Sequence, residues 1–224
     1  MDVAEAAPAK VAAGTVDDLL QTAERLFAHA GVENVALTQI VVQAGQRNRS
    51  ALHYHFGSRA GVLTAVLNRR LAPINARREA MIGDLPDSPT AAQVLQAEIM
   101  PLAQVALEEP WGADYLSILA QVVFHPQLLG EREVEAAHLS GLRRGRALLQ
   151  RAAPPLDAAV LDHRMRWFTD SVVFALARWM RDTPAIARTA ANLSELVAEL
   201  VAYGAAGLTA RAQPIEIGSK PHDQ

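Results

Sequence analysis

Hydrogen-bonding side chains are concentrated in residues 46–56, which read QRNRSALHYHF. If this stretch is helical, Leu52 and Phe56 lie four residues apart and share an inward face. The polar side chains then point outward: Arg49, Ser50, His53 and Tyr54. Such side chains can donate hydrogen bonds to phosphate oxygens and to the edges of bases. The chemistry available to this short helix is therefore recognition of a nucleic acid.

A preceding helix and a glycine turn would hold this outward face in place. One face of a helix predicted over residues 37–44 is apolar and consists of Leu37, Ile40, Val41 and Ala44. Gly45 ends that helix, and we expect it in the left-handed conformation that glycine adopts at low cost. The pattern is that of a helix-turn-helix, whose second helix enters the major groove of DNA. The alternative is an ordinary solvated helical hairpin with the same residues on its surface.

The charge distribution distinguishes these two interpretations. Residues 34–78 contain no Asp or Glu, and seven arginines fall among them: Arg47, Arg49, Arg59, Arg69, Arg70, Arg77 and Arg78. A segment of this length with average composition would hold about five acidic residues. The chain as a whole has a net charge of −3, so one basic segment stands against an acidic remainder. This asymmetry favours a surface that meets DNA phosphates.

Three separated motifs in residues 1–72 resemble the DNA-binding domain of the TetR family of transcriptional regulators. The motifs A-x-x-L-F-x-x-x-G, I-x-x-x-A-G and L-x-Y-H-F-x-S-R are carried by Ala23, Leu26, Phe27 and Gly31, by Ile40, Ala44 and Gly45, and by Leu52, Tyr54, His55, Phe56, Ser58 and Arg59. The chain departs from the family pattern by one extra residue between Gly45 and Phe56. It also has Ala36 where a capping Ser or Thr is common, and His53 in place of a frequent Tyr.

The resemblance implies a homodimer that binds a double-stranded DNA operator, usually as a repressor and less often as an activator. It also implies a variable helical domain that binds a small-molecule effector, which we expect to be apolar and to release the repressor from its operator. We expect Arg49 and His53 to read bases, and Tyr54 and Arg59 to hold phosphates. The full set of expected DNA contacts is Arg47, Asn48, Arg49, Ser50, His53, Tyr54, His55 and Arg59.

The composition, rich in Ala, Leu, Arg and Glu and without sustained alternation, predicts an all-helical fold of about nine helices. We expect a flexible tail over residues 1–13, a DNA-binding domain over 14–72, a regulatory and dimerisation domain over 73–211, and a second tail over 212–224. Thr15 should cap the first helix and Ser58 the fourth, which Pro73 should kink or divide. Later helices are predicted over 89–108, with Ser88 as the cap, and over 112–124, 128–151, 156–181 and 185–210.

The two closing helices carry apolar residues at spacings of three and four. This spacing suits packing against other helices. The family resemblance implies that the partner is a second subunit in a four-helix interface, although the core of a single subunit is the alternative. The predicted interface residues are Leu161, Met165, Phe168, Val172, Trp179, Leu193, Val197, Leu200 and Gly204. Aromatic and polarisable residues on the central helices are candidates for an effector pocket, although such residues more often form core: Met100, Trp111, Tyr115, Phe124, His125, Trp167 and Phe168.

Other classes of protein fit the sequence less well. The chain has no cysteine, and its histidines lack the spacing of metal ligands, so we expect no disulfide, metal or cofactor. An all-helical enzyme would have to use pairs such as Asp162 and His163, or Glu131 and Glu133, which solvated helix faces explain better. A protein-interaction adaptor would not need the basic segment. Neither a signal peptide nor a membrane-spanning run is recognisable, so we expect a cytoplasmic protein without a membrane partner.

Overall fold

In a computed structural model, residues 13–46, 49–152 and 156–211 can be described, and nine α-helices lie within them. They are α1 (Ala13–Ala30), α2 (Leu37–Gln43), α3 (Arg49–Phe56), α4 (Arg59–Gly83), α5 (Ala91–Glu108), α6 (Gly112–Phe124), α7 (Ser140–Ala152), α8 (Ala158–Asp182) and α9 (Ala190–Thr209). Short 3₁₀ helices cover Val32–Asn34, Pro126–Leu129, Ala136–Leu139 and Ala185–Ala187. The predicted all-helical class is confirmed. The predicted tails lie outside these residues.

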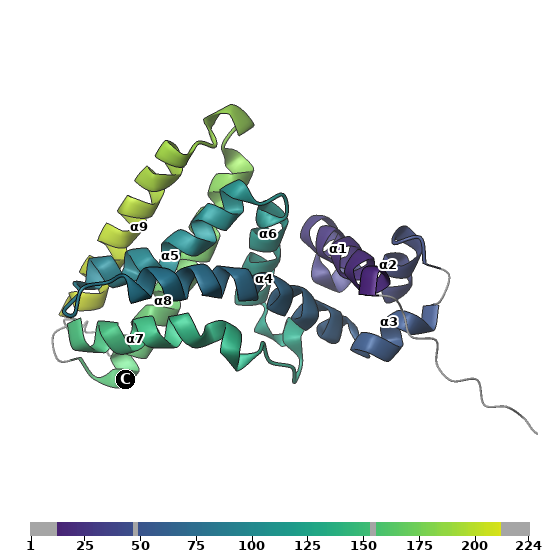
Figure 1. The fold of residues 1–224 in the computed structure, drawn as a ribbon, viewed down its shortest axis with the longest axis horizontal. Coiled ribbons are helices and arrows are strands. Elements are labelled where there is room, and N and C mark those ends of the chain that lie inside the picture. The colour runs from purple at the N-terminus through teal and green to yellow at the C-terminus, as the bar shows by residue number, and fades with distance from the viewer. Residues whose placement is uncertain (1–12, 47–48, 153–155, 212–224) are drawn as a thin grey trace, which may run out of the picture.

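Helices α1, α2 and α3 and the start of α4 form a small head at one end of the molecule (Figure 1). Apolar side chains from each of them meet in a dry core that includes Phe27, Ile40, Leu52 and Leu63, all at most 1% exposed. Gly31 ends α1 with a φ of 86°, as its place after the apolar stripe of that helix predicts. Thr15, the predicted cap of the first helix, lies within α1, which already includes Ala13.

Helix α4 leaves the head and continues into the larger domain without interruption (Figure 1). Ser58 caps it by accepting a hydrogen bond from the backbone N–H of Gly61, as predicted. Pro73 was predicted to kink or divide this helix, and the predicted division is wrong. A proline removes one backbone donor, and packing of α4 against α1, α5 and α7 holds the helix together across that point. Hence the predicted boundary at residues 72 and 73 lies inside a continuous helix.

The larger domain surrounds α5, which packs against α4, α6, α7, α8 and α9. In Figure 1, α9 and α8 meet at one end and diverge toward the loop that joins them. Three predicted helix starts are wrong. The last helix begins at Ala190 and not at residue 185, because a separate 3₁₀ helix covers Ala185–Ala187. Thr90, and not Ser88, caps α5 through a reciprocal capping box with Gln93. The helix predicted from residue 128 begins only at Ser140, because Gly130 has a φ of 59°, which is incompatible with a continuous α-helix. In the described part of the chain, no helix is both long and apolar enough to cross a lipid bilayer.

Candidate nucleic-acid interface and interior cavity

Helix α3 presents its polar face to solvent at the far end of the head. Leu52 is buried and Phe56 is half-buried, so the helix is fixed through the i and i+4 pair that its sequence predicts. His53, Tyr54 and His55 are exposed, Tyr54 by 73%. Arg49 and Ser50 belong to the helix, but their side chains lie outside the described part of the structure, as do Arg47 and Asn48 entirely.

Gly45 and Arg59 lie on the two sides of α3 in the sequence. Gly45 has a φ of 68°, the left-handed conformation predicted for the end of α2. Arg59, at the first position of α4, is exposed and donates a hydrogen bond from Nε to the backbone carbonyl of Val35 at 3.0 Å. This bond joins the start of α4 to the segment before α2. Arg59 therefore stands beside α3 and also supports the head.

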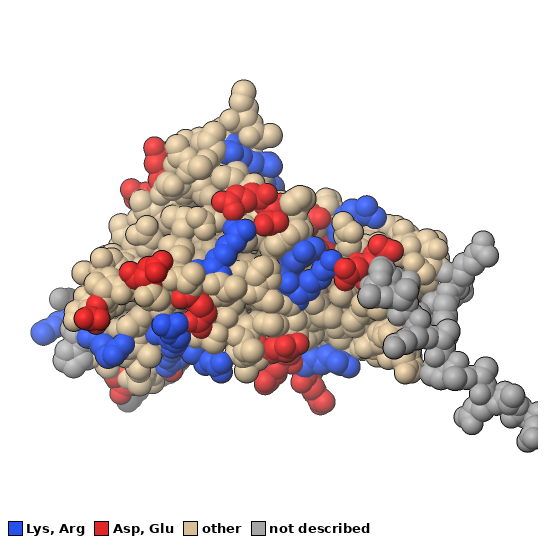
Figure 2. Space-filling view, in the orientation of Figure 1, with Lys and Arg blue, Asp and Glu red and all other residues tan. Residues whose placement is uncertain are grey.

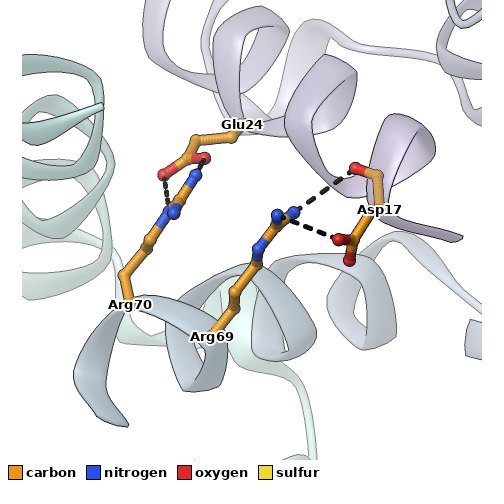
Figure 3. Close-up of polar contacts among 4 residues, drawn as sticks. All are labelled: Asp17, Glu24, Arg69 and Arg70. Carbon is orange, nitrogen blue, oxygen red and sulfur yellow. Dashed lines mark hydrogen bonds and ion pairs between the residues drawn. The ribbon is translucent and has the colours of Figure 1, made fainter. Parts of the chain in front are cut away.

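The seven arginines of residues 34–78 do not form one basic surface. Arg69 pairs with Asp17 at 3.5 Å (Figure 3). Arg70 donates to both carboxylate oxygens of Glu24, from Nε at 2.8 and 3.1 Å and from Nη2 at 2.6 Å. Arg77 pairs with Glu108 at 2.8 Å and Glu109 at 3.0 Å. Arg78 is 4% exposed. Figure 2 shows acidic and basic side chains interspersed.

Fewer arginines of residues 34–78 are therefore available to form a basic surface than the sequence indicates. Acidic residues of α1 and of the end of α5 lie against the arginines of α4, although they are distant in the sequence. Of the remaining three arginines, Arg59 is exposed, whereas Arg47 and the side chain of Arg49 lie outside the described part of the structure.

A cavity of about 250 Å³ lies inside the larger domain. Its apolar wall comes from α4, α6 and α8, with further residues from α5, α7 and the segment before α7; examples are Leu71, Leu119 and Val173. Four polar side chains also line it: Arg78 from α4, Glu98 from α5, Tyr115 from α6 and Thr169 from α8. An apolar wall with a few convergent polar groups is the usual composition of a small-molecule site.

Three of these polar groups are buried without complete hydrogen bonding. Arg78, Glu98 and Tyr115 are 4%, 7% and 0% exposed. Arg78 donates from Nε to the backbone carbonyl of Glu98 at 3.2 Å, but its Nη1 has no hydrogen-bond partner among the described residues. Within the same part of the chain, Oε1 of Glu98 and the hydroxyl of Tyr115 have none either. A buried polar group without a hydrogen bond is costly, so three of them around one cavity indicate that a ligand with a polar group binds in this cavity.

Burial dominates the ionisation of these groups. Desolvation raises the pKa of Glu98 to about 8, although the charge of Arg78 opposes the shift. Desolvation lowers the pKa of Arg78, an effect that Glu98 opposes. Desolvation also raises the pKa of Tyr115. At pH 7, therefore, Glu98 is mostly neutral and Tyr115 retains its proton, while an arginine remains charged.

The predicted pocket residues are spread over several places. Tyr115 and Phe168 line the cavity. Phe124 and His125 line an open groove of about 700 Å³ between α1, α6 and α8. Trp111 lies under Arg70, whose guanidinium carbon is 4.3 Å from the centre of the indole ring. Met100 is half-buried and Trp167 is 66% exposed, and neither lines the cavity or the groove.

The sequence interpretation missed Arg78 and Glu98. Glu98 was recognisable, because it lies in the middle of the apolar face of α5, four residues after Val94 and four before Leu102. An acidic residue in that position is rarely buried without a purpose. Arg78 gave no such signal, since it was one arginine among several in the basic segment.

Most of the predicted interface residues belong to the core of a single subunit, which corrects their expected place on an outer face. Six are buried within one chain: Leu161, Phe168, Val172, Leu193, Val197 and Gly204. Met165, Trp179 and Leu200 are half-buried. The physical reason is that α9 packs against α5, and Gly204 lies so close to the ring of Phe168 that a Cβ there would come within 2.2 Å of it.

A different apolar stripe on α8 remains on the surface. Val160, Trp167 and Phe174 recur every seven residues and are 38%, 66% and 41% exposed. On α9, Tyr203 is 64% exposed. Large apolar side chains grouped on one helix face usually mark a contact with another molecule.

Comparisons with known proteins agree with this architecture. Residues 19–66 match the model of bacterial regulatory proteins of the TetR family, and residues 96–207 match the tetracyclin repressor-like C-terminal domain. A comparison with curated proteins found no match.

Several solved structures share the fold. The fatty acid degradation regulator FadR from Bacillus halodurans is 15% identical, with a TM-score of 0.61 over 92% of this chain and 100% of that one. FadR from Bacillus subtilis, in complex with stearoyl-CoA, is 17% identical, with a TM-score of 0.51 over 85% and 98%. A regulator from Saccharomonospora viridis, in complex with choline, is 18% identical, with a TM-score of 0.51 over 85% and 95%.

A helix-turn-helix head joined by one long helix to a larger helical domain defines a DNA-binding transcriptional regulator. The chain belongs to the TetR family of bacterial transcriptional regulators. Members of this family are transcription factors and not enzymes, so the alternatives of an all-helical enzyme and an adaptor are set aside.

Proposed function

We propose that this protein is a repressor that binds a two-half-site operator as a homodimer and leaves it when a small, largely apolar effector occupies the interior cavity. Residues 14–72 would read DNA, and residues 73–211 would bind the effector and the second subunit. Such a regulator acts in the cytoplasm, where its operator is. The observation that carries the proposal is that the cavity and the head are held by the same two helices, α4 and α6.

Helix α4 connects the two sites directly. Its residues Leu67, Leu71, Ile74 and Arg78 line the cavity, while Arg70, between them, forms the ion pair with Glu24 of the head (Figure 3). A ligand that displaces α4 therefore also displaces α1, because the buried ion pair leaves little freedom between them.

Helix α6 connects them a second time. The Ser117 hydroxyl donates to the carbonyl of Ala28 at 3.1 Å, and Gln121 Nε2 donates to that of Phe27 at 3.0 Å. The backbone N–H of Val32 donates to Gln121 Oε1 at 2.8 Å. Three hydrogen bonds thus attach the end of α1 to a helix whose other face, with Tyr115 and Leu119, lines the cavity.

The effector would alter DNA binding by shifting the two heads of a dimer relative to each other. Half-sites on DNA are spaced by about one helical turn, roughly 34 to 36 Å, so a change in head spacing weakens simultaneous binding. Two similar structures are complexes with small molecules, stearoyl-CoA and choline, which is consistent with an effector site in this chain. A volume of about 250 Å³ would not enclose a whole stearoyl-CoA molecule, which favours a smaller effector for this chain.

The test of the proposed function is a fluorescence anisotropy titration with DNA that flanks the gene for this protein. We expect one fragment to bind more tightly than random duplex of the same length, with two subunits bound. Equal affinity for all fragments would contradict a sequence-specific regulator.

Affinity for DNA should fall steeply with salt. If the two subunits together contact about six phosphates, about six counterions are released and the slope of log K against log salt is about −5. A slope near −12 would instead indicate that the arginines of α4 also reach DNA, and a slope near zero would contradict the electrostatic contribution. Titrations at several potassium chloride concentrations measure it.

Arg49 and Arg59 should differ in how they contribute to binding. Arg49→Ala should cost about 1 to 3 kcal/mol on the operator and relax sequence preference, because we expect Arg49 to donate to a base edge. Arg59→Ala should weaken all duplexes about equally, as expected of a phosphate contact. Because Arg59 also donates a hydrogen bond to Val35, the stability of the Arg59→Ala variant must be measured together with its affinity for DNA. Equal losses for Arg49→Ala on operator and random DNA would reverse the assignment.

A further inference from the structure

The identity of the effector can be narrowed from the polar groups of the cavity, provided that the cavity is the effector site proposed above. We propose that the cavity binds a small monocarboxylate, with an apolar body of roughly ten non-hydrogen atoms, whose carboxylate pairs with Arg78. Three observations support this: the size of the cavity, the donors left without partners, and a polar opening that leads to them.

The size of the cavity sets the length of the ligand. At the packing density of protein interiors, about 250 Å³ holds roughly ten to twelve non-hydrogen atoms. Most of the wall is aliphatic, from residues such as Leu67, Ile99 and Val122. A medium-length alkyl chain or a single ring with a short side chain fits such a space.

The unpartnered groups select the head group. Arg78 offers Nη1 as a donor, and the neutral Tyr115 offers its hydroxyl. Glu98, whose pKa burial raises to about 8, offers the proton of a neutral carboxyl at pH 7. Only Arg78 is then charged in an apolar space. A carboxylate accepts from all three groups and neutralises the guanidinium, whereas an amine would add a second positive charge and an amide would leave Arg78 without a counter-ion.

We infer that the cavity opens near Glu98, because it shares lining residues there with a second, more polar hollow. Glu98, Leu142 and Thr169 line both the cavity and a second hollow of about 290 Å³, which is also lined by Arg146, Asp162 and Arg166. Arg146 and Asp162 form an ion pair at this opening. The surplus of basic side chains there would attract an anion toward Arg78. The head group would therefore lie at the open end, with the apolar body directed inward.

The charged and titratable groups around Glu98 come from every wall of the site. They are Arg78 on α4, Tyr115 on α6, Arg146 on α7, and Asp162 and Arg166 on α8. No charged residue among the described residues of α9 lines the cavity or its opening. Glu98 also lies against Gly145 of α7, where a Cβ would clash with its carboxylate. Between pH 7 and pH 9, therefore, the charge around the ligand changes because Glu98 ionises.

The experiment is isothermal titration calorimetry of the full-length protein with matched probes: octanoate, octanamide and octylamine, and 4-phenylbutanoate with its amide. At pH 7 we expect at least one carboxylate to bind about tenfold more tightly than its amide. Arg78→Met should remove that preference, and thermal unfolding should verify that this variant is folded. A preference for the amine or the amide in the wild-type protein overturns the proposal, as does the failure of both carboxylates to bind.

The pH dependence supplies a second, independent measurement. Between pH 7 and pH 9 the affinity for the carboxylate should fall about tenfold, because Glu98 ionises and repels the ligand. Glu98→Gln copies the neutral carboxyl and should abolish the fall. A fall of the same size in Glu98→Gln would overturn the assigned role of Glu98.

Titrations of DNA without ligand separate this inference from the proposed function. A protein that binds its operator but no carboxylate is a regulator with a different effector. A protein that binds carboxylates through Arg78 but no DNA retains the site and loses the proposed function.

Discussion

Replacing Arg70 by methionine is expected to lower the free energy of unfolding by about 3 to 5 kcal/mol, because the change leaves a buried carboxylate without its counter-ion. The side chain of Glu24 is only 4% exposed, and that of Arg70 is 12% exposed. Three hydrogen bonds hold the pair, and the guanidinium also lies over the ring of Trp111. Methionine keeps the apolar stem of arginine, so the loss reports mainly the charge.

The neighbouring pair of Arg69 and Asp17 is a matched control (Figure 3). Both pairs join α4 to α1, but the side chains of Arg69 and Asp17 are 31% and 66% exposed. Exposed pairs contribute about 0 to 1 kcal/mol, so Arg69→Met should be almost neutral. Urea unfolding curves of both variants measure the difference. Losses of similar size would mean that water reaches the Glu24 pair and that the head is less firmly attached.

The double variant Glu24→Leu with Arg70→Met separates charge from packing. Replacing both partners of a buried pair by apolar residues is often neutral, so stability should return to near the wild-type value. The head would then be joined to α4 by apolar contacts alone. If the pair also transmits effector binding, this variant should remain folded and bind the operator, while effector no longer releases it.

Local signals along the chain predicted the head well. Gly31 and Gly45 end their helices with positive φ, and Ser58 caps α4, because each of these roles depends on one or two residues and their neighbours. The same holds for α6, whose bounds of Gly112 and Phe124 match the prediction. Pro73 misled the prediction, since the penalty for a proline within a helix is local while the packing that outweighs it is not.

Properties that depend on contacts distant in the sequence could not be predicted in the same way. Counting charges in residues 34–78 predicted a basic face, but the acidic partners of Arg70 and Arg77 lie outside that segment. Similarly, helical spacing identifies an apolar face without naming what covers it. Phe168 and Val172 were predicted to contact a second subunit. Instead they line the cavity, on a helix that packs against α5 and α9 of the same chain.

The exposed stripe on α8 leads to the last prediction: Trp167→Glu should separate the subunits. Trp167 lies between Val160 and Phe174 on one face, and each large apolar side chain gains about 1.5 to 3 kcal/mol on burial. A second copy of the chain would bury this face, and a glutamate in its centre would bring an unpaired carboxylate into the contact. Operator affinity should then be lost although no residue of α3 has changed, because one head alone contacts one half-site.

Sedimentation velocity measures the outcome of Trp167→Glu directly. Ala80→Glu, an added carboxylate at an exposed position of α4, is the control and should sediment as the wild-type dimer. A Trp167→Glu protein that remains a dimer and binds its operator with unchanged affinity would place the interface on another face. A wild-type protein that is monomeric at operator-binding concentrations would contradict the dimer itself.

Val172→Glu distinguishes the core of one subunit from the interface between subunits. Since Val172 is 5% exposed within one chain, that variant should lose folding stability as well as association.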